Sequence, residues 1–261
     1  MDKVTSSDGT LIAYERTGEG PALVLVHGAT ADHTRWAPVL PMLGDRFTVY
    51  ALDRRGRGES GDSPAYSLER EYEDIAAVVS SISGPVNLLG HSYGALISLE
   101  AALLLTNLSK LILYEPPIRL DRPIYPPGIR SRLQALLDSG DREALLLLFL
   151  REVAKLPEDE IAMLRNAGAW EARLAAAHTV VRELAAEDYV LNPAKFRNSA
   201  VPTMLLRGEE SPDTTREMIE ALHGALPNSK IVVIPGQQHI AMRTAPEVFV
   251  SLVTEFLTEP A

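Results

Sequence analysis

Short apolar runs alternate with amphipathic segments in the first and last thirds of the chain. Apolar or β-branched runs bounded by Gly and Pro are typical of buried strands, whereas apolar residues spaced three and four apart predict helices. Strands are predicted at 10–15, 22–26, 47–52, 86–89, 110–114, 203–206 and 230–234, the first two as a hairpin. Helices are predicted at 68–80, 95–105, 214–225 and 246–257. This alternation predicts an α/β fold with a parallel sheet covered on both faces.

The segment 116–200 has a different pattern, with helical spacing and no convincing strand. It opens with a Pro-rich stretch, and helices are predicted at 129–137, 142–154, 158–165 and 171–186. We therefore expect residues 116–200 to be a helical cap inserted between two core strands. Residues 1–115 and 201–261 would form the core domain.

Composition narrows the possible functions. The 261-residue chain is 46% hydrophobic and 23% charged, with a net charge of −10, which is ordinary for a globular protein. The acidic balance argues against a nucleic-acid partner, since such a surface needs clustered basic residues. The absence of cysteine excludes disulfides, thiolate metal sites and a cysteine nucleophile. No histidine and carboxylate pair shows metal-ligand spacing, so no metal is expected.

Targeting signals are not evident in the sequence. The first eight residues are polar and lack the apolar core of a signal peptide. The most lipid-like stretch, residues 145–150, is far shorter than the roughly 20 residues that span a bilayer. We expect a cytoplasmic protein without a membrane partner. Its oligomeric state cannot be read from the sequence.

A single G-x-S-x-G motif, Gly90-His91-Ser92-Tyr93-Gly94, lies between the predicted strand 86–89 and the predicted helix 95–105. In that context the turn is so tight that glycines are needed on both sides of the serine, whose backbone is strained. The serine side chain is then exposed at the carboxyl edge of the sheet. The alternative, a serine in an ordinary Gly-rich turn, does not require this strand and helix. Ser92 is the predicted nucleophile.

A nucleophilic serine also needs donors for the oxyanion and a general base. The loop His27-Gly28-Ala29-Thr30 follows a predicted strand, so the backbone N–H groups of Ala29 and Tyr93 are the expected oxyanion hole. His27 itself is expected to brace the loop. His239 follows the last predicted strand and comes after the serine in the chain, which makes it the predicted base.

The pattern offers two candidates for the carboxylate that orients the base, because two glutamates lie just beyond core strands. Glu210 follows the strand 203–206, and Glu115 follows the strand 110–114 and is held by Pro116-Pro117. The alternative interpretation is that Glu210 and Glu115 are solvated loop residues without a catalytic role. That interpretation fits Glu209 and Asp213 better than it fits these two.

A second glycine-rich segment, Asp53 to Gly61, matches the dinucleotide fingerprint in its spacing Gly56-x-Gly58-x-x-Gly61. That fingerprint requires the last glycine to open a helix and an acidic residue at a strand end about 20 residues later. Here the loop continues past Gly61. We interpret the segment as a structural turn held by Asp53 and Arg55, with no nicotinamide cofactor.

Taken together, these segments resemble the α/β-hydrolase family. The resemblance rests on His27-Gly28, the turn from Asp53 to Ser60, Gly90-x-Ser92-x-Gly94 and Gly236-x-x-His239, which occur in family order. It implies a mostly parallel eight-stranded sheet, with a helical cap after the sixth strand that roofs the substrate pocket.

The resemblance also bears on the acid and on the reaction. In the commonest family pattern the acid stands where this chain has Ser211, so Glu210, one residue earlier, is the first choice. Members resembling haloalkane dehalogenases place the acid after the sixth strand, where Glu115 stands, and Asp213 is the third candidate. Dehalogenase and epoxide-hydrolase chemistry is disfavoured, since those relatives carry an aspartate nucleophile in place of Ser92.

The sequence thus predicts a serine hydrolase that cleaves an ester or lactone through an acyl-enzyme and uses no cofactor. Trp36 and Trp170, with Tyr93, are candidates to line a pocket for a small, uncharged and partly apolar substrate. Two alternatives remain open: carbon–carbon bond hydrolysis on the same triad, and a ligand receptor with slow turnover on a retained hydrolase frame.

Overall fold

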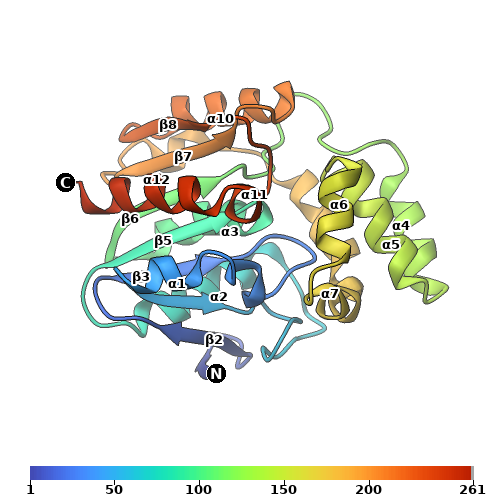
Figure 1. Cartoon of the computed structure of the whole chain (residues 1–261), viewed down its shortest axis with the longest axis horizontal. Coiled ribbons are helices and arrows are strands. Elements are labelled where there is room, and N and C mark those ends of the chain that lie inside the picture. The colour runs from blue at the N-terminus through green and yellow to red at the C-terminus, as the bar shows by residue number, and fades with distance from the viewer. Residues whose placement is uncertain (260–261) are drawn as a thin grey trace.

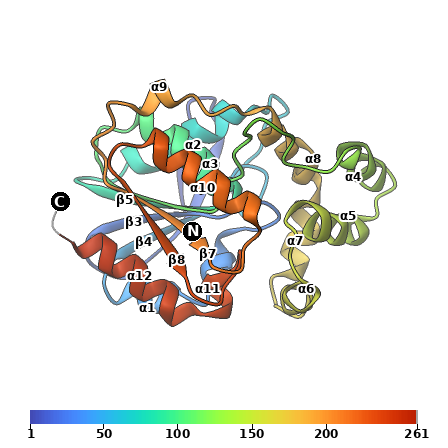
Figure 2. The same ribbon diagram turned by 90° about the horizontal axis from the view of Figure 1, so that it is seen from above.

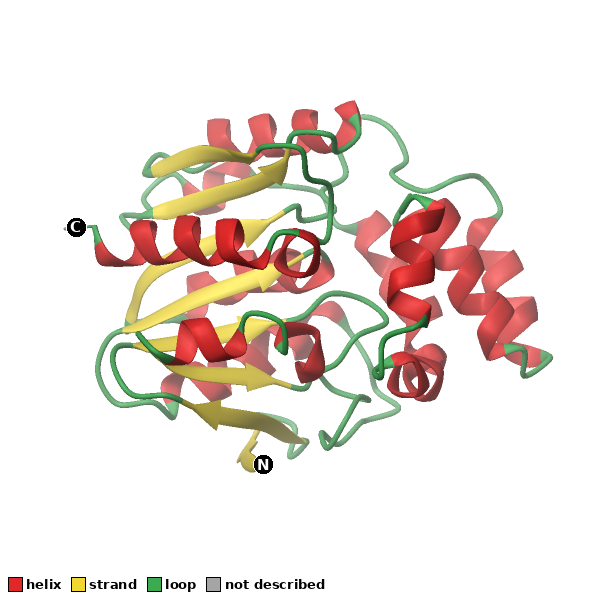
Figure 3. Ribbon diagram, in the orientation of Figure 1, coloured by secondary structure: helices red, strands yellow, loops and turns green. Residues whose placement is uncertain are grey.

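The structure is a computed structural model that describes residues 1–259, and its centre is one eight-stranded sheet (Figures 1 and 3). The strand order is β1-β2-β4-β3-β5-β6-β7-β8. The pairs β1–β2 and β2–β4 are antiparallel. All other neighbouring strands in the sheet pair in parallel. The strands are β1 (Asp2–Thr5), β2 (Leu11–Thr17), β3 (Ala22–Val26), β4 (Thr48–Leu52), β5 (Val86–His91), β6 (Leu108–Tyr114), β7 (Thr203–Gly208) and β8 (Ser229–Ile234).

Helices cover both faces of this sheet, as the view from above shows (Figure 2). One face carries α2 (Leu68–Ser80), α3 (Tyr93–Ala101) and α10 (Asp213–Ala225), and the other carries α1 (Leu40–Gly44), α11 (Ala241–Thr244) and α12 (Pro246–Thr258). Each face has its own apolar cluster. Because the central strands are buried on both faces, they are almost uniformly apolar, which is the pattern that parallel sheets require.

Between β6 and β7 the chain forms a helical segment, which we call the cap segment (residues 116–200). It contains α4 (Ile129–Asp138), α5 (Arg142–Leu148), α6 (Glu158–Arg165), α7 (Trp170–Ala176), α8 (Val180–Glu183) and α9 (Pro193–Phe196), with a π-helical turn at Phe149–Val153. In Figure 1, α4 to α7 lie together beyond the carboxyl ends of the parallel strands. Their apolar residues belong to the same cluster as those of α1 and α12, so the segment packs on the core.

The α/β class and the mostly parallel eight-stranded sheet are confirmed, but three details differ from the sequence expectations. The predicted hairpin is wrong: β2 pairs with β1 and β4, and β3 lies between β4 and β5. β1 lacks an apolar pattern and was not predicted as a strand. The helix expected at 171–186 is broken into α7, α8 and short 3-10 turns.

Within residues 1–259, none of the helices combines the length and apolar character needed to cross a bilayer.

Candidate active site

The turn between β5 and α3 holds Ser92 in a strained conformation. Its φ and ψ angles are 55° and −125°, in a region that non-glycine residues rarely adopt. The Ser92 N–H donates to the Tyr114 carbonyl of the neighbouring strand β6 at 2.8 Å. This anchor and the start of α3 directly after Ser92 keep the hydroxyl at the carboxyl edge of the sheet.

The glycines of the motif are required by close approaches of backbone. A Cβ atom at Gly90 would lie 2.5 Å from the Gly94 carbonyl oxygen, and one at Gly94 would lie 2.4 Å from the carbonyl oxygen of His27. A Cβ at Gly28 would lie 2.9 Å from the Ser92 Cβ. The turn can therefore pack against the loop after β3 only with glycine at these positions.

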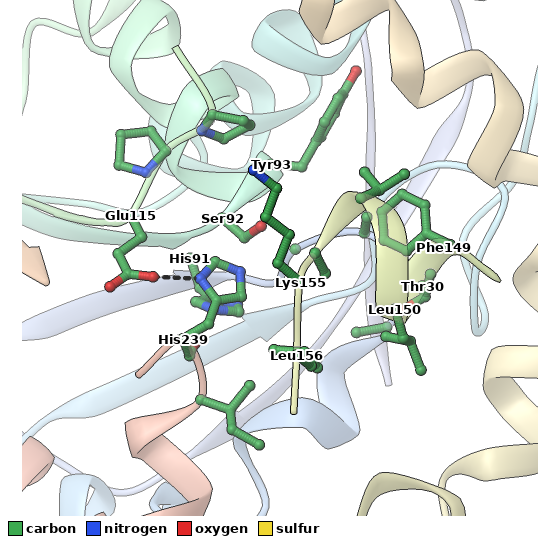
Figure 4. A pocket seen from close by; sticks show the side chains of 18 of the residues that line it. Thr30, His91, Ser92, Tyr93, Glu115, Phe149, Leu150, Lys155, Leu156 and His239 are labelled. Carbon is green, nitrogen blue, oxygen red and sulfur yellow. Dashed lines mark hydrogen bonds and ion pairs between the residues drawn. The ribbon is translucent and has the colours of Figure 1, made fainter. Parts of the chain in front are cut away.

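Glu115, not Glu210, lies beside the predicted base. The His239 Nδ1–H donates to Glu115 Oε2 at 2.6 Å, and the carboxylate is 5% exposed (Figure 4). Its other oxygen, Oε1, accepts from the Gly208 N–H at 2.8 Å and from Ser211 Oγ at 2.5 Å. A carboxylate that holds Nδ1–H leaves Nε2 of the imidazole free to act as an acceptor.

The first choice of acid is therefore corrected. The Glu210 side chain is exposed, and within the described residues it makes no hydrogen bond or ion pair; only its backbone N–H is bonded, to Gln237. Asp213 is also exposed and pairs with Arg216. Ser211, at the position where the common family pattern has its acid, instead donates to the Glu115 carboxylate. Sequence spacing put these loops at one edge of the sheet but could not show which carboxylate turned inward.

The loop that carries His239 is held by two groups that the sequence did not indicate. The His91 Nε2–H donates to the His239 carbonyl at 2.8 Å, and the two imidazole rings lie 4.6 Å apart. Tyr114 Oη donates to the Gln238 carbonyl and accepts from the Ala241 N–H at 3.2 Å. The His91 ring packs against the His239 ring. Burial lowers the pKa of His91 well below 6.5, which keeps the ring neutral.

The expected oxyanion donors, Ala29 and Tyr93, line the same pocket as Ser92 and His239. Tyr93 is the first residue of α3, so its N–H has no partner within the helix. On the other side, Arg173 Nη1 donates to both the carbonyl oxygen and Oγ1 of Thr30, each at 2.9 Å. Thr30 has a φ of 58°, so an arginine from α7 in the cap segment holds this strained loop.

His27 supports the loop His27–Thr30 through hydrogen bonds of its imidazole ring. Its Nε2 accepts the Arg54 N–H at 3.1 Å, and its Nδ1–H donates to the Gly28 carbonyl at 2.8 Å. The ring is fully buried, and burial lowers its pKa well below 6.5. These contacts agree with the structural role expected for it.

Within residues 1–259 no hydrogen bond joins the Ser92 hydroxyl to His239. Both side chains nevertheless face the same cavity (Figure 4), and such bonds are often formed only when substrate binds. The cavity encloses about 1070 Å³, counting its open mouth. Its walls come from the cap segment, the strand ends and α10, and they include Ile124, Tyr125, Phe149, Leu150, Val153, Leu156 and Met218.

The two tryptophans predicted to line the pocket do not do so. Trp36 is completely buried, with its ring against His91 and Phe249. Trp170 is 8% exposed and belongs to the apolar cluster of the cap segment. Large aromatic residues are most often used for core packing, and that is their role here. Tyr93 does line the pocket.

The glycine-rich turn after β4 is filled by protein side chains. A Cβ at Gly58 would lie 2.0 Å from an Asp53 carboxylate oxygen, and that oxygen accepts the Glu59 N–H at 2.9 Å. Gly61 does not open a helix, since α2 begins at Leu68. Arg55 pairs with Asp74 at 2.6 Å, as expected of a structural turn.

The side chains of Asp32, His33 and Asp53 do gather within 4.8 Å of one another, a spacing that could hold a metal ion and that the sequence did not indicate. Asp53 Oδ1 accepts from both the backbone N–H and Nδ1 of His33, at 2.9 and 2.8 Å. Asp32 Oδ1 caps the backbone N–H of Thr34 at 2.9 Å. These bonds account for the cluster without a metal.

Comparison with known proteins agrees with this fold. A family model described as "Alpha/beta hydrolase family" matches residues 23–252. The chain belongs to this family. This alpha/beta hydrolase is similar over most of its length to several other proteins.

Three relatives illustrate the range. The 2-(acetamidomethylene)succinate hydrolase of Mesorhizobium japonicum is 27% identical over 257 residues, covering 92% of this chain and 89% of that protein. The structure of an alpha/beta hydrolase from Sphaerobacter thermophilus is 38% identical, with a TM-score of 0.87 and coverage of 98% and 100%. A thermophilic esterase from Thermogutta terrifontis, in a structure with malate bound, is 26% identical, with a TM-score of 0.78 and coverage of 98% and 97%.

Proposed function

We propose that this alpha/beta hydrolase is a serine hydrolase that cleaves a carboxylic ester or lactone through an acyl-enzyme on Ser92. The observation that carries the proposal is the contact between His239 Nδ1 and Glu115 Oε2 at 2.6 Å, in a pocket that also contains the strained Ser92. Nucleophile, base and orienting acid are the three parts that acyl transfer needs.

In the proposed reaction His239 Nε2 takes the proton of Ser92 Oγ as the hydroxyl attacks the substrate carbonyl. The N–H groups of Ala29 and Tyr93 donate to the oxyanion that forms. His239 then gives its proton to the leaving alkoxide, and water, deprotonated by the same ring, hydrolyses the acyl-enzyme. The Glu115 carboxylate, which also accepts from the Gly208 N–H and the Ser211 hydroxyl, stabilises the imidazolium.

The nature of the relatives supports hydrolysis, and it guides the choice of substrates. One relative is named as an esterase and another as a hydrolase of an amidomethylene succinate. The mainly apolar pocket wall suits a small organic acyl group.

The test is turnover of p-nitrophenyl acetate and butyrate, of small lactones and of 2-(acetamidomethylene)succinate, together with labelling by a fluorophosphonate. We expect multiple turnovers and a covalent adduct at Ser92. Ser92→Ala should lose the adduct and at least about 1000-fold in kcat, as removal of a nucleophile does. Glu115→Gln should lose about 100-fold or more in kcat, whereas Glu210→Gln, the matched control, should keep the wild-type rate.

A Glu210→Gln loss equal to that of Glu115→Gln would contradict the assignment of the acid. Adduct formation with at most one turnover would favour a receptor, and the absence of both would reject the serine hydrolase itself. Turnover of a 1,3-diketone but of no ester would favour carbon–carbon bond hydrolysis.

A further inference from the structure

One buried cation in the pocket has no partner. Arg35 lies in the 3-10 turn His33–Trp36 after the oxyanion loop, lines the cavity, and is 6% exposed. Within residues 1–259 its guanidinium group makes no hydrogen bond and no ion pair, and its Nε is buried without any acceptor. Nearly all buried polar groups in proteins are bonded, so an unbonded buried guanidinium requires an explanation.

The other charged groups that line the cavity do not supply a counter-charge. Glu115 is occupied by His239, Gly208 and Ser211. Glu183 faces Arg54 and Arg57 in a buried cluster. The lining carboxylates thus already have cationic or hydrogen-bonding partners of their own, although Glu183 Oε2 itself accepts no hydrogen bond within residues 1–259.

Additional positively charged side chains line the same cavity as Arg35. Arg173 also lines the cavity and donates only to the neutral Thr30. Lys155, which has a φ of 53°, extends from the cap segment toward Ser92 (Figure 4). Outside the lining, Glu160 is buried but does not come within 4 Å of Arg35, and burial raises the pKa of its carboxyl group. The cavity therefore has excess positive charge in a protein whose net charge is −10.

The guanidinium group remains charged at neutral pH. Burial, together with repulsion from Arg173 and Arg243, lowers the pKa of Arg35 to about 9. That value is still well above 7, so the site presents a cation with unused donors. A planar guanidinium with free donors is the group that binds a carboxylate through two parallel hydrogen bonds.

We propose that Arg35 binds a carboxylate of the substrate, so that the natural substrate is an ester or lactone that also carries a free carboxylate. This inference rests on the proposed function and replaces the uncharged substrate expected from the sequence. Binding of that anion would satisfy the buried donors and compensate the charge that the fold leaves open. Arg35 would then be a specificity determinant, while the reacting atoms remain with Ser92 and His239.

The test compares esters of equal carbon-chain length that differ in charge. Monoethyl glutarate and ethyl pentanoate have the same number of chain atoms, and monoethyl succinate and adipate extend the series. Ethanol release gives kcat/KM for each ester in the wild type, Arg35→Met and Arg35→Lys. The wild type should prefer the best anionic ester over its neutral counterpart by about 10- to 100-fold, the range for hydrogen bonds to a charged group.

Arg35→Met should remove that preference, and Arg35→Lys should retain part of it. Arg46→Met is the matched control, because it removes an exposed arginine that does not line the cavity, and it should retain the full preference. A structural defect would lower the rates of both esters together, whereas loss of a carboxylate anchor lowers their ratio.

Binding without turnover provides an independent measurement. Ser92→Ala is titrated with glutarate, succinate and adipate by calorimetry, with the corresponding neutral diols as controls. We expect saturable binding of at least one dicarboxylate that weakens at least tenfold when Arg35→Met is added.

Hydrolysis of neutral esters with no anionic preference and no dicarboxylate binding would overturn the Arg35 proposal and leave the serine hydrolase intact. Hydrolysis of neither type of ester, with dicarboxylate still bound, would reject the ester and lactone reaction and retain the anion site.

Discussion

Arg54 and Arg35 are both almost completely buried, yet their surroundings differ. Arg54 donates to Glu71 through Nε at 2.9 Å and Nη2 at 2.6 Å, and it also contacts Glu183. Its neighbour Arg57 binds the same Glu183 at 2.5 Å. Arg35 has no partner within the described residues. Within residues 1–259 Arg54 Nη1, Arg57 Nε and Glu183 Oε2 also lack a hydrogen bond, yet their charges are paired within the cluster. The comparison therefore concerns charge pairing: the Arg54 cluster contains its own carboxylates, whereas Arg35 has none and has the properties of a site for a charged ligand.

The ion pairs of the Arg54 cluster connect different parts of the fold. Arg54 and Arg57 lie in the turn after β4, Glu71 lies on α2, and Glu183 lies on α8 of the cap segment. The Arg54 guanidinium is also 4.4 Å from the centre of the Tyr93 ring, next to the nucleophile. The cluster therefore ties the cap segment to the core at the edge of the site.

The largest effect is expected from breaking the paired cluster. Arg54→Met leaves Glu71 and Glu183 buried with fewer partners, and should lower the free energy of unfolding by about 3–5 kcal/mol. Urea denaturation followed by circular dichroism measures this. Arg151→Met is the control, because its partner Glu158 is exposed, and it should leave stability nearly unchanged. Equal stability of the two variants would show that the buried cluster is not structural.

A smaller loss is expected from Arg173, which is buried but bonded only to Thr30. Arg173→Met leaves the Thr30 carbonyl without that donor, so stability should fall by about 1–3 kcal/mol. Because the oxyanion loop would lose its support, kcat for a neutral ester should fall by about tenfold with little change in KM. A change confined to KM would show that Arg173 acts on substrate binding and not on the loop.

The contrast between these arginines could not be predicted from the sequence. The elbow at Ser92 and the order of Ser92 and His239 were readable, because local turn chemistry and chain order determine where they lie. The choice between Glu115 and Glu210 depended on which side chain turned inward at the ends of neighbouring strands. Trp36 and Arg35 are adjacent in the chain, and only tertiary packing placed one in the core and the other at the cavity.

The buried histidines make the stability of the protein depend on pH. An unfolded histidine has a pKa near 6.5, whereas burial lowers the pKa of His91 and His27 well below that value. Below pH 6.5 the unfolded state therefore binds more protons, and stability falls as pH falls by up to about 1.4 kcal/mol per pH unit for each ring. His33 acts in the opposite direction, because its hydrogen bond to Asp53 raises its pKa.

The net effect is a loss of stability between pH 6.5 and 5.5, measured by urea denaturation at each pH. The His33 contribution is fully present below its unfolded pKa near 6.5 and is lost as pH rises through its raised folded pKa. His91→Gln should make the loss smaller by about 1 kcal/mol over that interval, since one buried titrating ring is removed. An unchanged pH dependence in this variant would show that His91 can be protonated in the folded protein.

The smallest expected effect is that of Arg35→Met on stability, and its sign is opposite to that of Arg54→Met. It is the sharpest test of the comparison between the two arginines. Arg35→Met removes a buried charge that has no partner and keeps a long apolar side chain, so stability should rise by about 0.5–1 kcal/mol. Thermal unfolding without ligand measures this, and the increase should shrink when a dicarboxylate stabilises the wild type but not the variant. If Arg35→Met instead destabilises the unliganded protein as Arg54→Met does, then Arg35 is part of the folded frame, and its open donors do not mark a site for the substrate.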